Sequence, residues 1–311
     1  MTRKRILPQI RSPELELSLV RDIDASTDAT RRANVVQTGG EPIVAFAETS
    51  NPYIDFHRND VLHSLQHMRT EAYDEFPFIV MTQVKELIFR SIHYELANIQ
   101  QRIRDDDLTG ALVLAPRLRR CLELLVKTWD VLSTITTQGF NAFRDQLGTS
   151  SGQQSYAYRH VEFILGNKSR RLAAAHANNP DVYPAIAEAL NSPSLYDDAI
   201  ALLHRRGFVI PQDRLERDWA EDYAPSPAVA AAWLAVYDTP TPENDLYQLG
   251  EMLIEIDDLF SQFRWRHFVS VQRILGLKPG TGGSAGVGWL RAAVDLRFFP
   301  ELWSIRTEMG A

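Results

Sequence analysis

DLYQLGEMLIEIDDLFSQFRWRHFVSVQRIL, residues 245–275, decides the fold class, because its apolar side chains recur at intervals of three and four. That spacing is typical of an α-helix with one buried face. We expect the helix to take Thr241 as its N-cap, with Pro242 at the first helical position, and to end at Gly276. The expected buried face consists of Leu246, Leu249, Leu253, Ile256, Phe260, Phe263, His267, Val271 and Ile274.

The same spacing occurs in three earlier segments, 61–65, 76–103 and 118–135, whereas alternating strand patterns are scarce. The chain is therefore predicted to be an all-α bundle of long helices. Its expected breaks are Gly110, Pro116, Gly139, the turn 149–152, Pro193 and the joint 225–227. We expect an N-terminal arm over residues 1–45 that is flexible, and a single domain over 46–311. That domain includes a variable helical insertion at about 169–238.

Composition excludes several classes of protein. The 311 residues are 45% hydrophobic and 23% charged, which is typical of a folded chain. The net charge of −7 argues against a nucleic-acid-binding protein, which normally carries a basic face. Cys121 is the single cysteine, lies among leucines and is predicted to be a core residue, which suits a reducing compartment. No apolar run approaches the roughly 18 residues of a membrane span. We therefore expect a cytoplasmic protein without membrane or nucleic-acid partners.

His267 interrupts the apolar face of the last long helix and has two interpretations. A buried imidazole needs a hydrogen-bond partner, so His267 could be a core histidine bonded to a backbone carbonyl. Alternatively, a neutral imidazole on a rigid helix, surrounded by Leu and Phe, is a suitable axial ligand for haem iron. Because the chain has no CxxCH motif, such a haem would be held without thioether links.

Two further segments carry residues suited to ligand binding. GTGGSAGVG, residues 280–288, exposes backbone N–H groups and the hydroxyls of Thr281 and Ser284, although taken alone it is better explained as a mobile surface loop. FRDQLGTSSG, residues 143–152, contains Arg144, which could bind a substrate carboxylate through two hydrogen bonds or form an ordinary surface ion pair.

Other motifs are weaker. GTSSG at 148–152 matches the G-x-S-x-G of hydrolases, but that turn requires a preceding strand. His63 and His67 are four residues apart, as in a metal-binding pair, and an exposed helix face explains them more simply. The His-Val-Glu triplet at 160–162 has the spacing of some iron sites, yet this spacing is common by chance.

Three longer stretches, FRDQLGTSSGQQSYAYRHVEFILGNK (143–168), RWRHFVSVQRILGLKPGTGGSAGVGWL (264–290) and FFPELWSIRTEMG (298–310), are similar to segments of tryptophan 2,3-dioxygenases. The chain resembles this family from about Tyr53 to its C-terminus. The resemblance implies an all-α homotetramer that encloses haem b and uses O₂ as co-substrate. It also implies a substrate that is L-tryptophan or a side-chain-substituted tryptophan, such as the β-methyl derivative.

The resemblance assigns roles to individual residues. His267 becomes the expected proximal ligand of the haem iron, Arg144 the partner of the substrate carboxylate, and Thr281 a contact of the amino-acid head group. The other implied positions are Trp129 beside the haem, Ser151 and Gly152 over its edge, Phe78, Thr82 and Phe140 in the substrate pocket, and Tyr53, which reaches a neighbouring subunit.

Four positions depart from the family pattern. Tyr73 stands where a distal histidine is usual, Thr82 replaces a second histidine, Gln153 a phenylalanine and Ser50 a tyrosine. We take Tyr73 as the catalytic residue, and read the set of changes as favouring a natural-product monooxygenase. Such an enzyme would form a 2-oxindole or hydroxyindole and draw electrons from an external reductant. One alternative is a dioxygenase that forms N-formylkynurenine; another is a non-catalytic haem-binding or gas-sensing protein.

Overall fold

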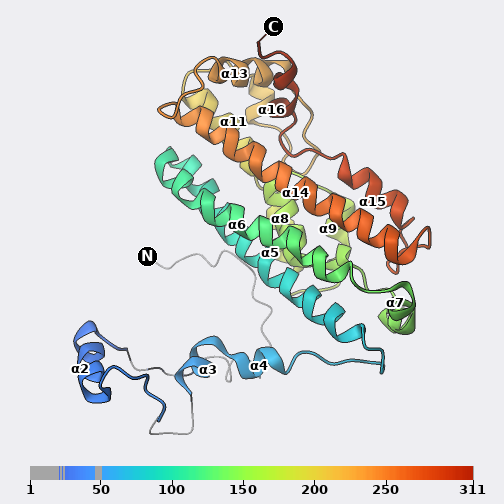
Figure 1. The fold of residues 1–311 in the computed structure, drawn as a ribbon. Helices are drawn as coiled ribbons and strands as arrows, with labels where there is room; N and C mark the ends of the chain where they lie inside the picture. The colour runs from blue at the N-terminus through green and yellow to red at the C-terminus, as the bar shows by residue number, and fades with distance from the viewer. Residues whose placement is uncertain (1–20, 22, 24, 46–50, 311) are drawn as a thin grey trace. The chain divides into compact units, whose positions relative to one another are not determined.

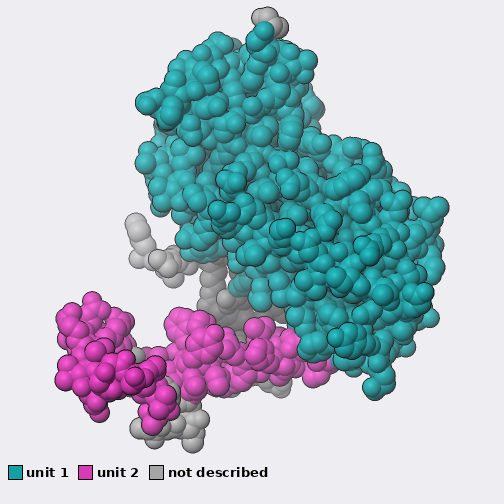
Figure 2. Space-filling view, in the orientation of Figure 1, with its two compact units in different colours: residues 1–8, 68–311 teal, residues 9–67 magenta. Residues whose placement is uncertain are grey.

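Helices are the secondary structure of the residues that the computed structural model describes, namely 21, 23, 25–45 and 51–310, and no strand occurs among them. The predicted all-α class is therefore confirmed. These residues divide into two units at Met68, which Figure 2 shows in different colours. The unit before Met68 contains α2 (Asp28–Thr38), α3 (Pro52–His57) and α4 (Asn59–His63).

Three long helices dominate the unit that follows Met68 (Figure 1). They are α5 (Glu75–Arg104), α6 (Leu108–Leu132) and α14 (Asp245–Leu275), and α6 packs against both of the others. Shorter elements surround them: α7 (Thr137–Phe143), η1 (Arg144–Leu147), η2 (Gly152–Gln154), α8 (Tyr156–Leu165), α9 (Arg170–Ala174), α10 (Tyr183–Leu190), α11 (Leu195–Arg205), α12 (Gln212–Leu215), α13 (Pro227–Tyr237), α15 (Val287–Val294), α16 (Pro300–Ser304) and η3 (Ile305–Thr307).

Helix α14 buries the predicted face except at His267 and Val271, which are half-buried, and its expected N-cap is wrong. The cap is Asn244, whose side chain accepts a hydrogen bond from the Tyr247 backbone N–H at 3.1 Å. The Asn244 amide also donates to the carbonyl of Val236 at the end of α13 and to that of Thr239 in the turn that follows, so Thr241 lies outside the helix. The helix ends before Gly276, whose φ of +62° favours glycine. The apolar residues of the face from Leu246 to Phe263 are buried.

The expected breaks at Gly110, Pro116 and Gly139 are also wrong, because all three residues lie inside helices. Gly110 sits in the first turn of α6, where its N–H donates to the Asp107 side chain at 2.9 Å. Pro116 lies further along α6 and removes one backbone hydrogen bond. The burial of Leu118, Leu122 and Leu125 beyond it offsets that loss.

Helix α2 was not predicted from the sequence. None of its eleven residues is buried, so it has no apolar face to reveal it. Its local signals are an N-cap at Thr27 and a left-handed C-cap at Gly39.

Buried polar contacts hold the C-terminal segment to α14. The fully buried Asp257 carboxylate accepts hydrogen bonds from the backbone N–H groups of Phe298 and Phe299, at 2.9 and 3.3 Å. It also accepts one from the Trp303 indole at 2.9 Å. Because a buried carboxylate requires such donors, Asp257 fixes where the chain returns to the bundle.

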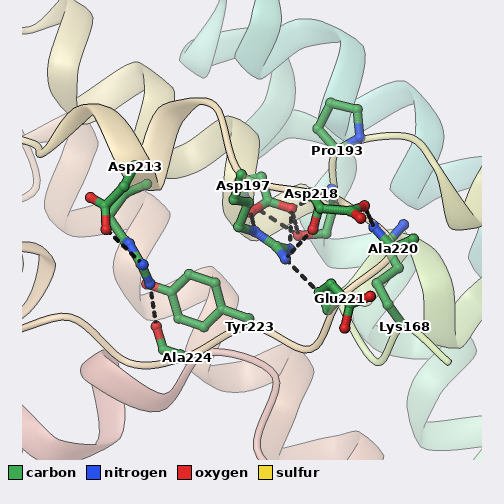
Figure 3. A network of polar contacts seen from close by, with 12 residues as sticks. Lys168, Pro193, Asp197, Asp213, Asp218, Ala220, Glu221, Tyr223 and Ala224 are labelled. Atoms are coloured by element: carbon green, nitrogen blue, oxygen red, sulfur yellow. Dashed lines mark hydrogen bonds and ion pairs between the residues drawn. The ribbon is translucent and has the colours of Figure 1, made fainter.

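A polar network organises the segment between α8 and α14 (Figure 3). Arg217 donates from Nε and Nη2 to both oxygens of the buried Asp197, at 2.8 and 3.0 Å, and from Nη1 to the Glu221 carbonyl at 2.8 Å. Arg170 pairs with Asp218 and Glu221 at 2.7 and 3.1 Å. The bidentate contact of Arg217 with Asp197 and the two ion pairs of Arg170 connect a stretch whose helices are short.

Two buried histidines, His93 on α5 and His160 on α8, make stability depend on pH. Their rings lie 5.3 Å apart and are 7% and 4% exposed. Burial lowers the pKa of His93 to about 4 and that of His160 to about 3, and for His160 the charge of His93 adds to this effect. Both are therefore neutral in the folded chain at pH 5, where the unfolded chain binds protons with a pKa of about 6.5.

The two histidines therefore leave the free energy of unfolding unreduced above about pH 6.5, and they lower it progressively as the pH falls from there towards 4. Between pH 7.5 and 5.0 we expect the free energy of unfolding to fall by about 2 kcal/mol for each histidine. Urea unfolding at the two pH values measures the difference. His93→Gln should show a smaller fall, and an equal fall in that variant would rule out this explanation.

Candidate functional site

A cavity of about 460 Å³ lies among α5, α6, α14, α15 and the loops around residues 150 and 281. An adjoining cavity of about 80 Å³ shares several of its walls and continues towards Phe89 and Phe263. Eight of the residues to which the family resemblance assigns roles line the larger cavity: Phe78, Thr82, Trp129, Phe140, Ser151, Gly152, His267 and Thr281. The fold therefore brings together side chains separated by up to about two hundred residues.

His267 reaches this cavity from α14. The Trp129 ring stacks on the imidazole, with centroids 4.5 Å apart and planes inclined by 14°. Desolvation, and then the charge of Lys85, lower the pKa of His267 to about 3, so the ring is neutral at pH 7. Within the described part of the chain, neither ring nitrogen of His267 has a hydrogen bond. The buried His93 and His160 also have an unpartnered ring nitrogen, but His267 differs from them in lining the cavity. A neutral imidazole with a free lone pair is a suitable ligand for iron.

The glycine-rich loop lies against the turn at residues 149–152. The Thr281 hydroxyl donates to the Ser150 carbonyl at 2.6 Å. A Cβ atom on Gly282 would fall 2.6 Å from the Cβ of Ser151, which is closer than side chains approach one another. Glycine is therefore required for this contact, which joins two segments about 130 residues apart into one wall of the cavity.

Arg144 lies beside the same loop. Its Nη2 donates to the Pro279 carbonyl at 2.6 Å, and its Nε is buried without a hydrogen-bond partner among the described residues. Arg144 does not itself line the cavity, but it contacts the segment that continues into Gly280 and Thr281, which do. The guanidinium thus has donors left for a ligand at this end of the site.

Aromatic side chains form the wall near α7. Phe78 contacts Phe140 and Phe143 with centroid distances of 5.7 and 5.3 Å, and Phe140 contacts Phe143 at 5.1 Å. The Thr82 hydroxyl donates to the Phe78 carbonyl at 2.8 Å and keeps its acceptor capacity. This apolar wall suits a planar aromatic ligand.

Other predicted site residues are not part of the cavity. Tyr73 lies in the turn before α5 with 89% of its surface exposed. Tyr53 belongs to the unit before Met68, where it is 64% exposed. Ser50 falls outside the described residues. Gln153, by contrast, does line the cavity.

The weaker sequence motifs gain no support. Glu162 accepts hydrogen bonds from Tyr158, Arg159, Asn167 and Arg264, which leaves it engaged within the bundle. The described residues contain no group of three or more His, Cys, Asp or Glu arranged to hold a metal ion. No strand precedes the turn at 148–152 in the described chain, so it is not a hydrolase motif. Burial raises the pKa of the half-buried Cys121 thiol, which packs against the core.

Sequence reasoning missed two charged residues of the cavity, Lys85 and Glu86. The Lys85 ammonium lies 4.2 Å from the centroid of the Trp129 ring, and burial lowers its pKa to about 8. The Glu86 carboxylate accepts a hydrogen bond from the Ser155 hydroxyl at 2.9 Å, and burial raises its pKa. Their spacing could have revealed them, since both follow Thr82 by one helical turn and so lie on the same face of the helix.

The cavity suits a haem. It has one neutral imidazole, an aromatic ring stacked beside that imidazole, and apolar walls that exclude water. The Trp129 indole N–H is also buried without a partner in the described chain. These residues match the donor set that a haem held by a single histidine requires.

Comparison with known proteins agrees with this site. The family model described as tryptophan 2,3-dioxygenase matches residues 38–193 and 234–309. The chain belongs to the tryptophan 2,3-dioxygenase family. It is therefore an enzyme of the oxygenase class, and the predicted resemblance is confirmed. The unmatched residues between the two matched ranges carry Asp197, Arg217 and Glu221 of the network in Figure 3.

Individual relatives support the assignment. Tryptophan 2,3-dioxygenase 1 of Ralstonia nicotianae is 42% identical over 260 residues, which cover 84% of this chain and 88% of the relative. Tryptophan 2,3-dioxygenase of Polaromonas sp. is 43% identical over 257 residues, covering 83% and 87%. That of Ralstonia pickettii is 41% identical over 260 residues, covering 84% and 94%.

In the described part of this chain, no helix has the length and apolar character needed to cross a membrane.

Proposed function

We propose that this protein is a haem-dependent dioxygenase that adds both atoms of O₂ to the indole C2–C3 bond of L-tryptophan, forming N-formylkynurenine. The observation that carries the proposal is the neutral His267 imidazole facing a cavity whose wall includes Phe78, Phe140 and Thr281. The relatives named tryptophan 2,3-dioxygenase favour this reaction over monooxygenation.

In the proposed complex, His267 holds the iron of haem b and Trp129 keeps the imidazole in place by stacking on it. Ser151 and Gly152 contact the cofactor at its edge. Ferrous haem, when bound, supplies the binding and activation of O₂. The apolar side chains around His267 exclude water, which strengthens the polar contacts made inside the cavity.

The substrate is held at both of its ends. Arg144 binds the tryptophan carboxylate with its remaining N–H donors, and the Thr281 hydroxyl contacts the amino-acid head group. Phe78 and Phe140 pack against the indole ring. Together these contacts orient the C2–C3 bond, and such positioning accounts for much of the rate enhancement in reactions of this type.

Monooxygenation to a 2-oxindole or hydroxyindole is the second candidate. This candidate rests on Thr82 and Gln153, which line the cavity at two positions where the sequence departs from the family pattern. Tyr73 gives this candidate no support, because its side chain lies outside the cavity. This reaction needs electrons from an external reductant, whereas dioxygenation consumes none.

The two reactions differ in the isotope content of the product. Reduced, hemin-loaded protein is mixed with L-tryptophan under ¹⁸O₂, and the mass of the product is measured by mass spectrometry. We expect N-formylkynurenine carrying two ¹⁸O atoms and no continuing demand for reductant. A product with one ¹⁸O atom and a steady demand for electrons would establish monooxygenation. Unchanged tryptophan would instead support a non-catalytic haem protein.

The family resemblance also underlies a proposed homotetramer in which Tyr53 reaches a neighbouring subunit. Helix α3 presents Tyr53 and Phe56 with 64% and 72% of their surfaces exposed, and exposed aromatic side chains are frequent at protein interfaces. Light scattering tests the assembly, since a tetramer has about four times the mass of the 35.3 kDa chain.

A further inference from the structure

Lys85 is a cation of the cavity wall that forms no ion pair with the described residues. It follows Phe78 and Thr82 along one face of α5, and all three residues line the cavity. Among the described residues, the Lys85 ammonium has no hydrogen bond and no ion pair; its contact is the Trp129 ring. Arg264, which lines the adjoining cavity, is by contrast paired with Glu162 at 3.1 Å.

The charge of the neighbouring Glu86 compensates that of Lys85 only in part, because burial outweighs it. Glu86 is engaged by the Ser155 hydroxyl and forms no ion pair with Lys85. A cation–π contact stabilises an ammonium far less than water does, and burial accordingly lowers the pKa of Lys85 to about 8. The amine nevertheless remains mainly protonated at pH 7. The cavity therefore keeps a poorly solvated positive charge, which an anionic ligand would neutralise.

The ligands of the proposed function carry three carboxylates. One belongs to tryptophan and is assigned to Arg144, whereas the other two are the propionates of haem b. Trp129 contacts both Lys85 and His267, so the ammonium lies near the group that His267 holds. A lysine has three donors on a flexible stem and can follow a carboxylate that enters the cavity.

We propose that Lys85 is the counter-ion of one haem propionate, and that its ammonium pairs with that carboxylate when the cofactor is bound. Lys85 is thus a cofactor-binding residue of this cavity. The inference rests on the proposed haem site and concerns the cofactor's carboxylates, not the oxygenation outcome.

Hemin and hemin dimethyl ester, in which both propionates are esterified, separate this role from simple packing. Each is titrated into the full-length apoprotein and into its Lys85→Met variant, and the Soret absorbance gives the affinity. We expect Lys85→Met to bind hemin roughly ten- to a hundredfold more weakly, the range of one charge-assisted hydrogen bond. Both proteins should bind the ester with similar affinity, which also shows that the variant is folded. Lys85→Arg should retain most of the preference for hemin.

Lys127→Met is the matched control, because Lys127 is exposed on α6 and pairs with Asp130 at 3.4 Å outside the cavity. It should bind hemin as the unaltered protein does. If Lys85→Met loses affinity equally for hemin and the ester, or loses none for hemin, the inference is wrong while the haem site stands. If the unaltered protein binds neither compound, the proposed function itself fails.

Discussion

Replacing His267 with alanine is expected to abolish tight retention of hemin. The described cavity lining contains no other histidine, methionine or cysteine, so the variant has no imidazole or sulfur ligand to take its place. The folded chain should persist, because the imidazole makes no hydrogen bond with the described residues and its loss leaves no donor or acceptor unpaired. Gel filtration after loading with hemin, followed by Soret absorbance, measures retention.

Two controls make the His267→Ala result specific. His204→Ala alters an exposed histidine on α11 and should retain hemin. Imidazole added to the His267→Ala protein should restore a Soret band, because the small molecule can enter the space left by the side chain. A variant that keeps the hemin affinity of the unaltered protein would show that another residue holds the iron.

Replacing Arg144 with alanine should weaken the binding of L-tryptophan by roughly 1.5–3 kcal/mol, the range for hydrogen bonds to a charged group. The change removes the donors proposed for the carboxylate and also the 2.6 Å hydrogen bond to Pro279. Arg144→Lys should recover only part of the loss, because an ammonium cannot form the paired hydrogen bonds of a guanidinium. The shift of the Soret band on addition of tryptophan gives the dissociation constants.

Tryptamine, which lacks the carboxylate, distinguishes the two effects of the Arg144→Ala change. If Arg144 binds the carboxylate, the variant and the unaltered protein should bind tryptamine with similar affinity. An equal loss for tryptamine and tryptophan would mean that Arg144 acts only by holding the loop at Pro279.

Errors in the sequence-based prediction of helices have a common cause. Pro116 and Gly110 were expected to end helices because each disfavours helical backbone, yet the burial of Leu118 and Leu122 keeps α6 continuous. Local propensity amounts to about 1–3 kcal/mol at such positions, and the burial of two leucines is comparable. Thr241 was expected to cap α14, but Asn244 caps it, and the side chain of Asn244 also donates to the carbonyls of Val236 and Thr239.

The sequence by itself determined the all-α class, the buried face of α14 and the position of His267 on that face. Periodicity reveals these features because they depend on the geometry of one helix. Only the tertiary structure decided that His267 meets Trp129 from α6, that Thr281 contacts Ser150, and that Lys85 enters the cavity whereas Tyr73 does not. Those contacts join residues far apart in the chain, and they depend on how the helices pack against one another.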